Sequence, residues 1–165
     1  MPSPAGTATT AAADDPGLAI APSQLPARHA ALLNGNLLSH GFAGGRWTSA
    51  LTRGIRAFKA AFGKAGWKYR DDWTVAGYPS YALQTKDGGA VVWYFLKDRQ
   101  TAVRMGSGRP LQPGRVVRAL TGRSQVVHRF AIESVSEFVA IIPPKGKGEI
   151  TIKAGSTGNV TAAAS

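Results

Sequence analysis

The sequence predicts an α+β fold, in which a curved antiparallel sheet of about five to six strands packs on an amphipathic helix. Two observations lead to this class. Apolar residues recur at helical spacing in the first part of the chain, and short β-rich runs separated by tight-turn signals follow them. The composition agrees, because 44% hydrophobic and 18% charged residues in a chain of 165 can form one hydrophobic core.

A short first helix is expected between Pro26 and Gly35. Proline is favoured in a first helical turn, and Ala30 and Leu33 belong to an apolar stripe at helical spacing. Gly35 interrupts this stripe, so the helix is expected to end there.

The strongest helix signal lies over residues 48–66. Thr48 or Ser49 is suited to cap its start, and Gly63 or Gly66 to end it. One face carries the apolar residues Leu51, Ile55, Phe58 and Phe62. The basic residues lie off that face: Arg53, Arg56, Lys59 and Lys64. The pattern therefore predicts an amphipathic helix with a cationic outer side.

The sheet begins where the period changes to two, after the second helix. Two β-rich runs, the first beginning at Trp73 and the second ending at Asp98, flank the sequence Asp87-Gly88-Gly89, which is typical of a hairpin turn. Pro79 lies within the first run and favours an edge strand, or one bulged near its middle. Residues 101–105 are expected to continue the second run.

The remaining strands are expected in the C-terminal part of the chain. Residues 106–114, with three glycines and two prolines, indicate a loop. Strands are then expected over 116–120, 124–142 and 149–155, with the PPKGKG sequence as a turn before the last. Cystatin-like and NTF2-like cones, in which a curved sheet wraps around a helix, both fit this order.

The two ends of the chain differ from its middle in composition. Residues 1–23 are rich in Ala, Thr and Pro and are expected to form a disordered linker. Residues 156–165 are similar and are expected to be a flexible tail. A single α+β domain is therefore expected over residues 24–155.

The charge is strongly basic, with 20 Lys and Arg against 9 Asp and Glu and a formal net charge of +11. Such a charge favours anionic partners. Residues 46–70 and 99–129 hold 14 of the basic residues and no acidic one. We expect an anion-binding surface that includes Arg53, Arg56, Lys59, Arg104, Arg109, Arg115 and Arg118.

No pattern of catalytic or metal-binding residues is evident. The chain has no cysteine, which excludes disulfides and thiolate zinc sites. The three histidines lack metal-like spacing, and His29 and His40 are expected at the surface. Asp71 and Asp72 are adjacent, so in an extended chain they point to opposite faces. We therefore expect no catalytic residue, no metal and no cofactor.

The aromatic residues offer a candidate pocket. Residues 91–96 are apolar at every position, which predicts a central strand covered on both faces by a second helix or a partner chain. A curved sheet around a helix often encloses an apolar cavity. The candidate pocket residues are Trp67, Trp73, Trp93 and His128.

Two motifs resemble those of a known family. DGGAVVWYF at 87–95 is similar to a DGGALVF-like strand, and FVAIIPPKGKGEITIKAG at 138–155 to a YVPPKG-like turn with a final strand. Together they resemble the C-terminal part of a family of actinobacterial secreted proteins and lipoproteins, a domain of unknown function. The resemblance covers about residues 47–155. It implies an extracellular or envelope location and no assigned catalytic residues.

The location depends on a leader or anchor ahead of Met1, because residues 1–17 have no basic n-region and no continuous apolar core. With such a segment the protein is expected at the envelope or outside the cell, and without it in the cytoplasm. No apolar run approaches the ~18 residues that span a bilayer.

The leading hypothesis is a non-enzymatic envelope-associated domain that binds an anionic polymer or a partner protein through its basic surface. A second is a single-stranded nucleic-acid-binding module that uses Arg with Trp67 and other aromatic residues. A third is an NTF2-like enzyme with a small-molecule pocket around His128 and Glu133. The sequence leaves the oligomeric state open.

Overall fold

The computed structural model describes residues 8–36, 40–106 and 108–165. Three helices are present in these residues: α1 (Leu25–Leu33), α2 (Leu51–Lys64) and α3 (Arg115–Thr121). The strands are β1 (Trp67–Val75), β2 (Tyr81–Gln84), β3 (Ala90–Arg104), β4 (Arg129–Ile142) and β5 (Thr151–Ala164). A single 3₁₀ turn at Pro22–Gln24 leads into α1, and a π-helical turn at Arg46–Ala50 leads into α2.

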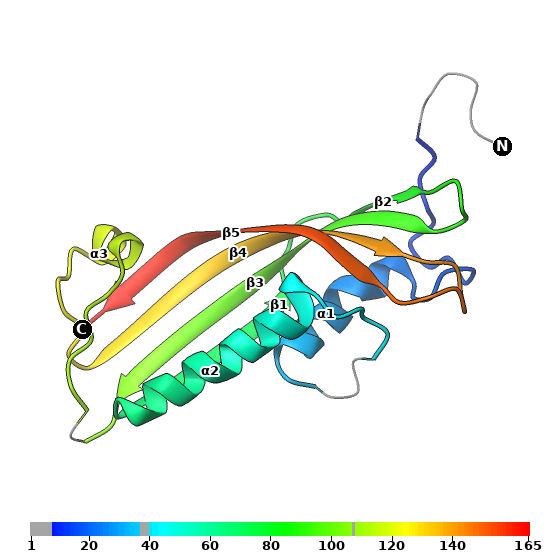
Figure 1. Cartoon of the computed structure of the whole chain (residues 1–165). Helices are drawn as coiled ribbons and strands as arrows, with labels where there is room; N and C mark the ends of the chain where they lie inside the picture. Colours follow the sequence, from blue (N-terminus) through cyan, green and yellow to red (C-terminus); the bar gives the residue numbers. More distant parts are fainter. Residues whose placement is uncertain (1–7, 37–39, 107) are drawn as a thin grey trace.

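The strands form one antiparallel sheet in the order β1-β3-β4-β5 (Figure 1). β2 and β1 pair with successive parts of β3 along the same edge, β2 with 90–93 and β1 with 96–104. Pro79 lies between these two strands, so it interrupts the first predicted run and separates it into two. The predicted α+β class and the predicted hairpin at Asp87-Gly88 are confirmed, and the cystatin-like or NTF2-like cone stays a prediction.

The two faces of the sheet differ in cover. Residues of β3 and β4 with even numbers alternate with those of odd numbers, and the even set is the more deeply buried. Helices α1 and α2 lie along that side (Figure 1). We call this the covered face and the other the open face. On β1 the odd residues belong to the covered face.

The core consists of two apolar clusters on the covered face. The larger one gathers side chains of α1, β3 and β4, among them Leu25, Tyr94 and Phe138. The smaller one lies at the far end of β3 and includes Trp67 and Phe130. α2 spans both, because Leu51 and Ile55 pack on the first cluster and Phe62 on the second.

The N-terminal segment differs from the predicted linker over its described part. Leu18 and Ile20 are buried in the larger cluster. Ala11 N–H donates to Ala82 O at 3.0 Å, and Ala19 N–H donates to Pro143 O at 2.9 Å. Backbone pairing and two large apolar side chains offset the ordering entropy that the surrounding small residues cannot. Residues 1–7 lie outside the described residues.

The predicted tail at 156–165 is instead most of β5. The strand pairs with β4 from Ile141↔Thr151 to Phe130↔Ala164, with register shifts after Glu133 and Val139. The strand was not predicted, because its small side chains show no apolar alternation. It forms nevertheless, since strand pairing uses backbone groups that every residue carries.

The segment 116–120, predicted as a strand, lies within helix α3. A run this short fits either element by period alone. The helix is set by its ends: Gly114 stands before it, and Gly122 adopts φ 66° as its left-handed C-cap. No helix in the described part of the chain is long and apolar enough to cross a membrane.

Candidate functional site

The open face brings basic residues from three neighbouring strands together. In the register of the sheet, Arg70 of β1 pairs with Thr101 of β3, and Val103 of β3 pairs with Arg129 of β4. Arg99 lies two residues before Thr101 on β3 and therefore projects to the same face. Strand pairing thus gathers side chains that are about 60 residues apart in the sequence.

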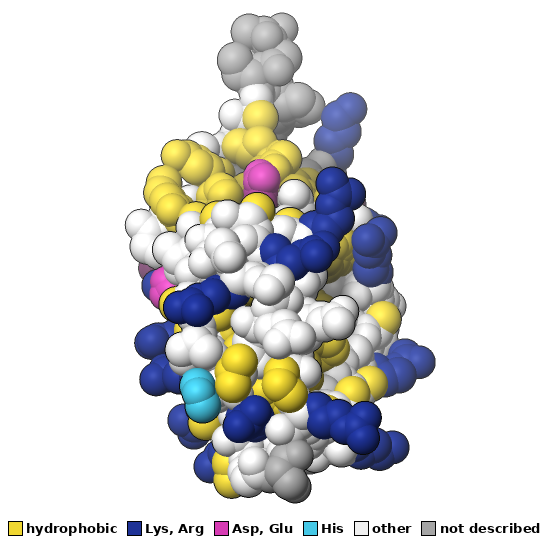
Figure 2. All heavy atoms as spheres, turned by 90° about the vertical axis from the view of Figure 1, so that its left-hand side faces the viewer, with side chains coloured by type: hydrophobic (Ala, Val, Ile, Leu, Met, Phe, Trp, Pro, Cys, Tyr) yellow, Lys and Arg dark blue, Asp and Glu magenta, His cyan; other side chains and the backbone are white. Residues whose placement is uncertain are grey.

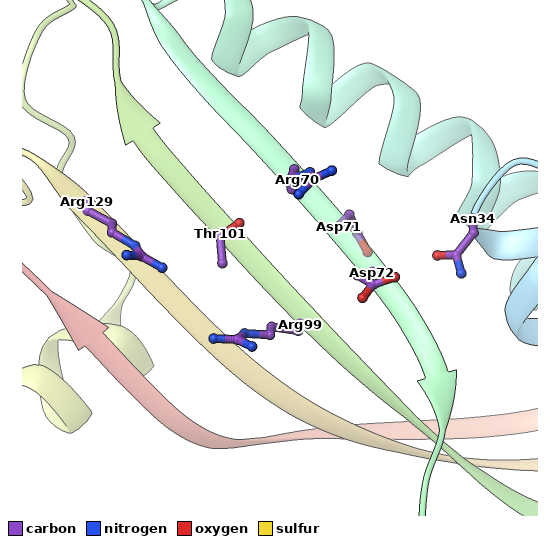
Figure 3. A pocket seen from close by; sticks show the side chains of 7 residues that line it. All are labelled: Asn34, Arg70, Asp71, Asp72, Arg99, Thr101 and Arg129. Atoms are coloured by element: carbon purple, nitrogen blue, oxygen red, sulfur yellow. The ribbon is translucent and has the colours of Figure 1, made fainter.

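These side chains line a hollow of about 590 Å³, which we call the basic hollow (Figure 3). It is lined by Asn34, Arg70, Asp71, Asp72, Arg99, Thr101 and Arg129. Arg99 extends from β3 over β4, away from Asp72, and Arg129 reaches back over the same region (Figure 3). Thr101 follows Arg99 on β3 by two residues, and its hydroxyl-bearing side chain lines the same hollow.

The arginines of the basic hollow are uncommitted. Arg70, Arg99 and Arg129 form no ion pair with any residue that the structure describes. The neighbouring cation Lys97 is already paired, with its Nζ 2.8 Å from Glu133 Oε1. Three exposed guanidinium groups thus stand over one hollow that two carboxyl groups, those of Asp71 and Asp72, also line, so the lining carries more positive than negative groups.

The hollow continues across the sheet towards β5. Two smaller depressions share Arg99, and both are lined in part by small side chains, including Ala131 of β4 and Ala163 of β5. Glu133, which is paired with Lys97, also lines one of them. Arg129 also lines one of them. Short side chains leave the backbone of β4 and β5 low, so the basic hollow is part of a longer trough over the open face.

An acidic pair lies on the other side of β1 and β3. Asp98 is only 2% exposed. Burial, followed by the neighbouring carboxyl group of Asp71, raises the pKa of Asp98 to about 8. Gln100 Nε2 donates to Asp98 Oδ2 at 2.6 Å, and Tyr69 Oη donates to Asp71 Oδ2 at 3.1 Å. At neutral pH Asp98 therefore holds a proton beside Asp71.

His29 is buried, which corrects its predicted place at the surface. Its Nε2 lies 2.8 Å from Trp47 O and its Nδ1 lies 2.8 Å from the hydroxyl of Tyr94. The carbonyl oxygen accepts only, so Nε2 carries the proton and Nδ1 accepts from Tyr94. Burial lowers the pKa of His29 to about 4. A neutral imidazole thus joins α1 to the sheet. His40 is exposed.

The predicted anion-binding residues do not lie together on one element. Arg53, Arg56 and Lys59 are exposed on α2, and Arg115 and Arg118 are exposed on α3. Arg104 ends β3, and the backbone carbonyl of Arg109 accepts a 2.8 Å hydrogen bond from Trp67 Nε1. The basic hollow uses other arginines of the same two sequence clusters.

The predicted pocket residues are also dispersed. Trp67 and Trp73 are buried on the covered face, whereas Trp93 is half-buried on the open face. His128 is exposed just before β4, and Glu133 on the open face is paired with Lys97. The buried Trp67 and Trp73 rings are not available for stacking on bases.

The sequence contained a partial signal for the basic hollow. Arg70 and Asp72, like Arg99 and Thr101, are two residues apart, as same-face positions in a strand require. However, the strand was expected to begin only at Trp73, and the partners across the sheet depend on a register that the sequence does not reveal. The buried Asp98 gave no signal of its own.

Comparison with known proteins identifies a family and a relative. A family model described as a domain of unknown function (DUF8094) matches residues 4–165. An uncharacterized lipoprotein of Streptomyces avermitilis is 31% identical over 147 residues, which cover 87% of this chain and 42% of that protein. The chain thus spans less than half the length of this relative. No solved structure matches it.

Proposed function

We propose that this chain, which belongs to the DUF8094 family of domains of unknown function, is a non-enzymatic binding domain of the cell envelope. Its ligand is an anionic polymer that lies along the open face of the sheet. The observation that carries this proposal is a hollow of about 590 Å³ lined by Arg70, Arg99 and Arg129, which form no ion pair among the described residues.

The chemistry of the hollow suits phosphate or carboxylate groups. A guanidinium group presents several N–H donors in a planar fork that matches such oxyanions. Thr101 adds a hydroxyl donor at the floor, and the small residues Ala131 and Ala163 extend the trough across the sheet. A ligand with repeated charges can follow this trough, whereas a single small anion would use only part of it.

The envelope location is supported by the relative named a lipoprotein. The net charge of +11 acts in the same direction, because an anionic polymer is attracted over a distance set by the ionic strength. A non-catalytic role is supported by His29, which is fully buried and whose two ring nitrogens are both engaged.

Titration with polyphosphate tests the proposal, with the double variant Arg99→Ala/Arg129→Ala compared with Arg53→Ala/Arg56→Ala. Each variant loses two positive charges, but only the first changes the basic hollow. We expect the first to weaken binding about tenfold or more at low salt, and the second by about twofold, because close pairs outweigh distant charges. Binding of the unaltered protein should weaken steeply with added salt.

Equal losses in the two double variants would show that the whole surface charge, and not the basic hollow, attracts the polymer. Salt-insensitive binding would also contradict the proposal. A single-stranded oligonucleotide serves as the competing polymer: preferential binding with quenching of Trp93 emission on the open face would favour the nucleic-acid alternative.

A further inference from the structure

A second, chemically different pocket lies on the covered face. It has a volume of about 350 Å³ and is bounded by α2, by the segment that leads into α3, and by β3 and β4. The side chains that define it are Phe58, Phe62, Val117, Val126, Phe130 and Ile132. We call it the apolar pocket. Its lining is mostly hydrocarbon, which is typical of sites that bury an apolar ligand.

Helix α2 is incompletely covered above this pocket. None of its side chains is fully buried, although its apolar residues share one face. Phe58 is 49% exposed, while its ring lies 4.9 Å from that of Phe62 and 5.3 Å from that of Tyr69. An amphipathic helix normally buries its apolar stripe. Here the part of the stripe formed by Phe58 and Phe62 faces a space that the side chains of the described residues do not fill.

The polar side chains that line the apolar pocket are those of Gln100 and Gln112, and neither is charged. Gln100 lines the pocket, and its Nε2 donates to Asp98 Oδ2. The floor therefore offers no uncommitted ionic group to a ligand. A charged part of a ligand has to remain at the mouth.

The helices and the loop that bound the pocket carry only basic charges. Residues 51–64 and 99–132 contain no Asp or Glu, so every charged side chain of α2, α3 and the segment between β3 and β4 that leads to the pocket is basic. Lys59 follows Phe58 on α2, and Arg115 and Arg118 flank Val117 on α3. Figure 2 shows this end of the molecule, where Lys and Arg side chains surround patches of hydrophobic ones.

We propose that the apolar pocket binds the hydrocarbon chain of a free single-chain anionic amphiphile, such as a long-chain fatty acid. The chain lies between Phe58, Phe62 and Phe130, and the head group is held at the mouth by Arg115, Arg118 or Lys59. Val116, the neighbour of Val117 on α3, is 53% exposed and does not line the pocket. This site is on the opposite face from the basic hollow and does not depend on the proposed function.

Calorimetric titration of the full chain with palmitate tests the inference. Hexadecanol, which has the long chain without the charge, and butyrate, which has the charge without the long chain, serve as comparisons. We expect 1:1 binding of palmitate, weaker binding of hexadecanol and none of butyrate, because the chain and the head group both contribute. Val117→Trp, which fills the pocket, should weaken palmitate binding about tenfold or more. Val116→Trp on the exposed side of the same helix should leave it within about twofold.

A second measurement does not depend on altering the pocket. Trp67 lies in the smaller apolar cluster with Phe62, Phe130 and Val126, which line the pocket. Brominated palmitate should therefore quench Trp67 emission, and Trp67→Phe should remove the quenched component while circular dichroism shows the fold retained. The inference is overturned if palmitate does not bind, if the Val117→Trp and Val116→Trp variants bind alike, or if quenching is unchanged by Trp67→Phe.

Anionic phospholipid vesicles separate this inference from attachment to a membrane surface. If the protein cosediments with vesicles but does not bind palmitate, its ligand is a bilayer surface and not a free amphiphile. That result would overturn the inference. Loss of polyphosphate binding in Arg99→Ala/Arg129→Ala with palmitate binding retained would show that the two sites act separately.

Discussion

At the scale of single residues, two buried ionisable groups link the stability of the fold to pH in opposite directions. The pKa of Asp98 is raised to about 8, so its contribution to stability is full at low pH and is lost as the pH rises. The pKa of His29 is lowered to about 4, so stability is lost as the pH falls below the ordinary histidine range. Above the ordinary pKa range of histidine, the change of stability with pH therefore reports on Asp98 and not on His29.

Asp98→Asn should remove the loss of stability on the alkaline side. Between pH 7 and 8.5, the free energy of unfolding of the unaltered protein is expected to fall by about 1 to 2 kcal/mol, because the unfolded state has already released the proton that Asp98 keeps. The asparagine variant cannot titrate and should show little change over the same window. Urea unfolding at several pH values measures both slopes.

Asp72→Asn is the matched control, since Asp72 is exposed on the open face one residue away from the partner carboxyl of Asp71. The charge of Asp72 contributes least to the raised pKa of Asp98, so the slope of this variant with pH should be only slightly smaller than that of the unaltered protein. A slope that persists in Asp98→Asn would show that another group causes the pH dependence.

The two residues also differ in how far the sequence could reveal them. His29 stands four residues after Leu25 and four before Leu33, and both leucines are buried. Helical spacing alone would therefore have predicted that His29 lies on the inner face of α1. Its assignment to the surface followed residue type instead of spacing. Asp98 lies in the polar end of a long strand, and its burial beside Asp71 depends on the pairing of β1 with β3.

At the scale of elements, β5 shows that small residues can be required by close packing. A Cβ added to Gly155 would lie 2.8 Å from Phe138 Cδ1 and 3.0 Å from Trp47 Cδ2. The two rings contact each other with their centroids 5.7 Å apart, and Phe138 is fully buried. Gly155 therefore provides the space in which Trp47, at the entry to α2, packs on the sheet.

Gly155→Ala is expected to destabilise the fold by about 1 to 3 kcal/mol, because the buried rings must shift to admit a methyl group. Gly158→Ala in the same strand should be neutral or slightly stabilising, since a Cβ there meets no atom within 4 Å. Thermal unfolding of both variants measures the contrast. Equal destabilisation would point to strand propensity and not to the aromatic contact.

Prediction of the elements succeeded where periodicity was long and failed where it was short. Helix α2 was expected from four apolar residues on one face, and the hairpin from its Asp-Gly sequence. α3 is a seven-residue helix, too short for its period to distinguish it from a strand. β1 begins at Trp67 rather than Trp73, because an edge strand tolerates charged residues on its exposed face.

At the scale of the whole molecule, the α+β class follows from the order of the elements, whereas the sites follow from the register of the sheet. A helix followed by an antiparallel meander has to bury its apolar face on that sheet. The basic hollow joins Arg70, Arg99 and Arg129, and the apolar pocket joins α2, α3 and β4. Such combinations of distant segments require strand pairings that residue patterns leave undetermined.

Both ends of the described chain contribute to the fold, and Leu18 provides the test for the N-terminal one. It is 5% exposed, belongs to the larger core cluster and pairs with Pro144 through an isolated bridge beyond β4. Leu18→Ala should lower the free energy of unfolding by about 2 to 4 kcal/mol through the lost contacts and the resulting cavity. Leu120→Ala on α3, where the leucine is 45% exposed, should cost less than about 1 kcal/mol.

Chemical unfolding followed by fluorescence and circular dichroism measures both, and coincident transitions show that residues 8–23 unfold together with the sheet. If Leu18→Ala is as mild as Leu120→Ala, the segment contributes little to the core, and the linker predicted from composition describes its behaviour better than its packing does.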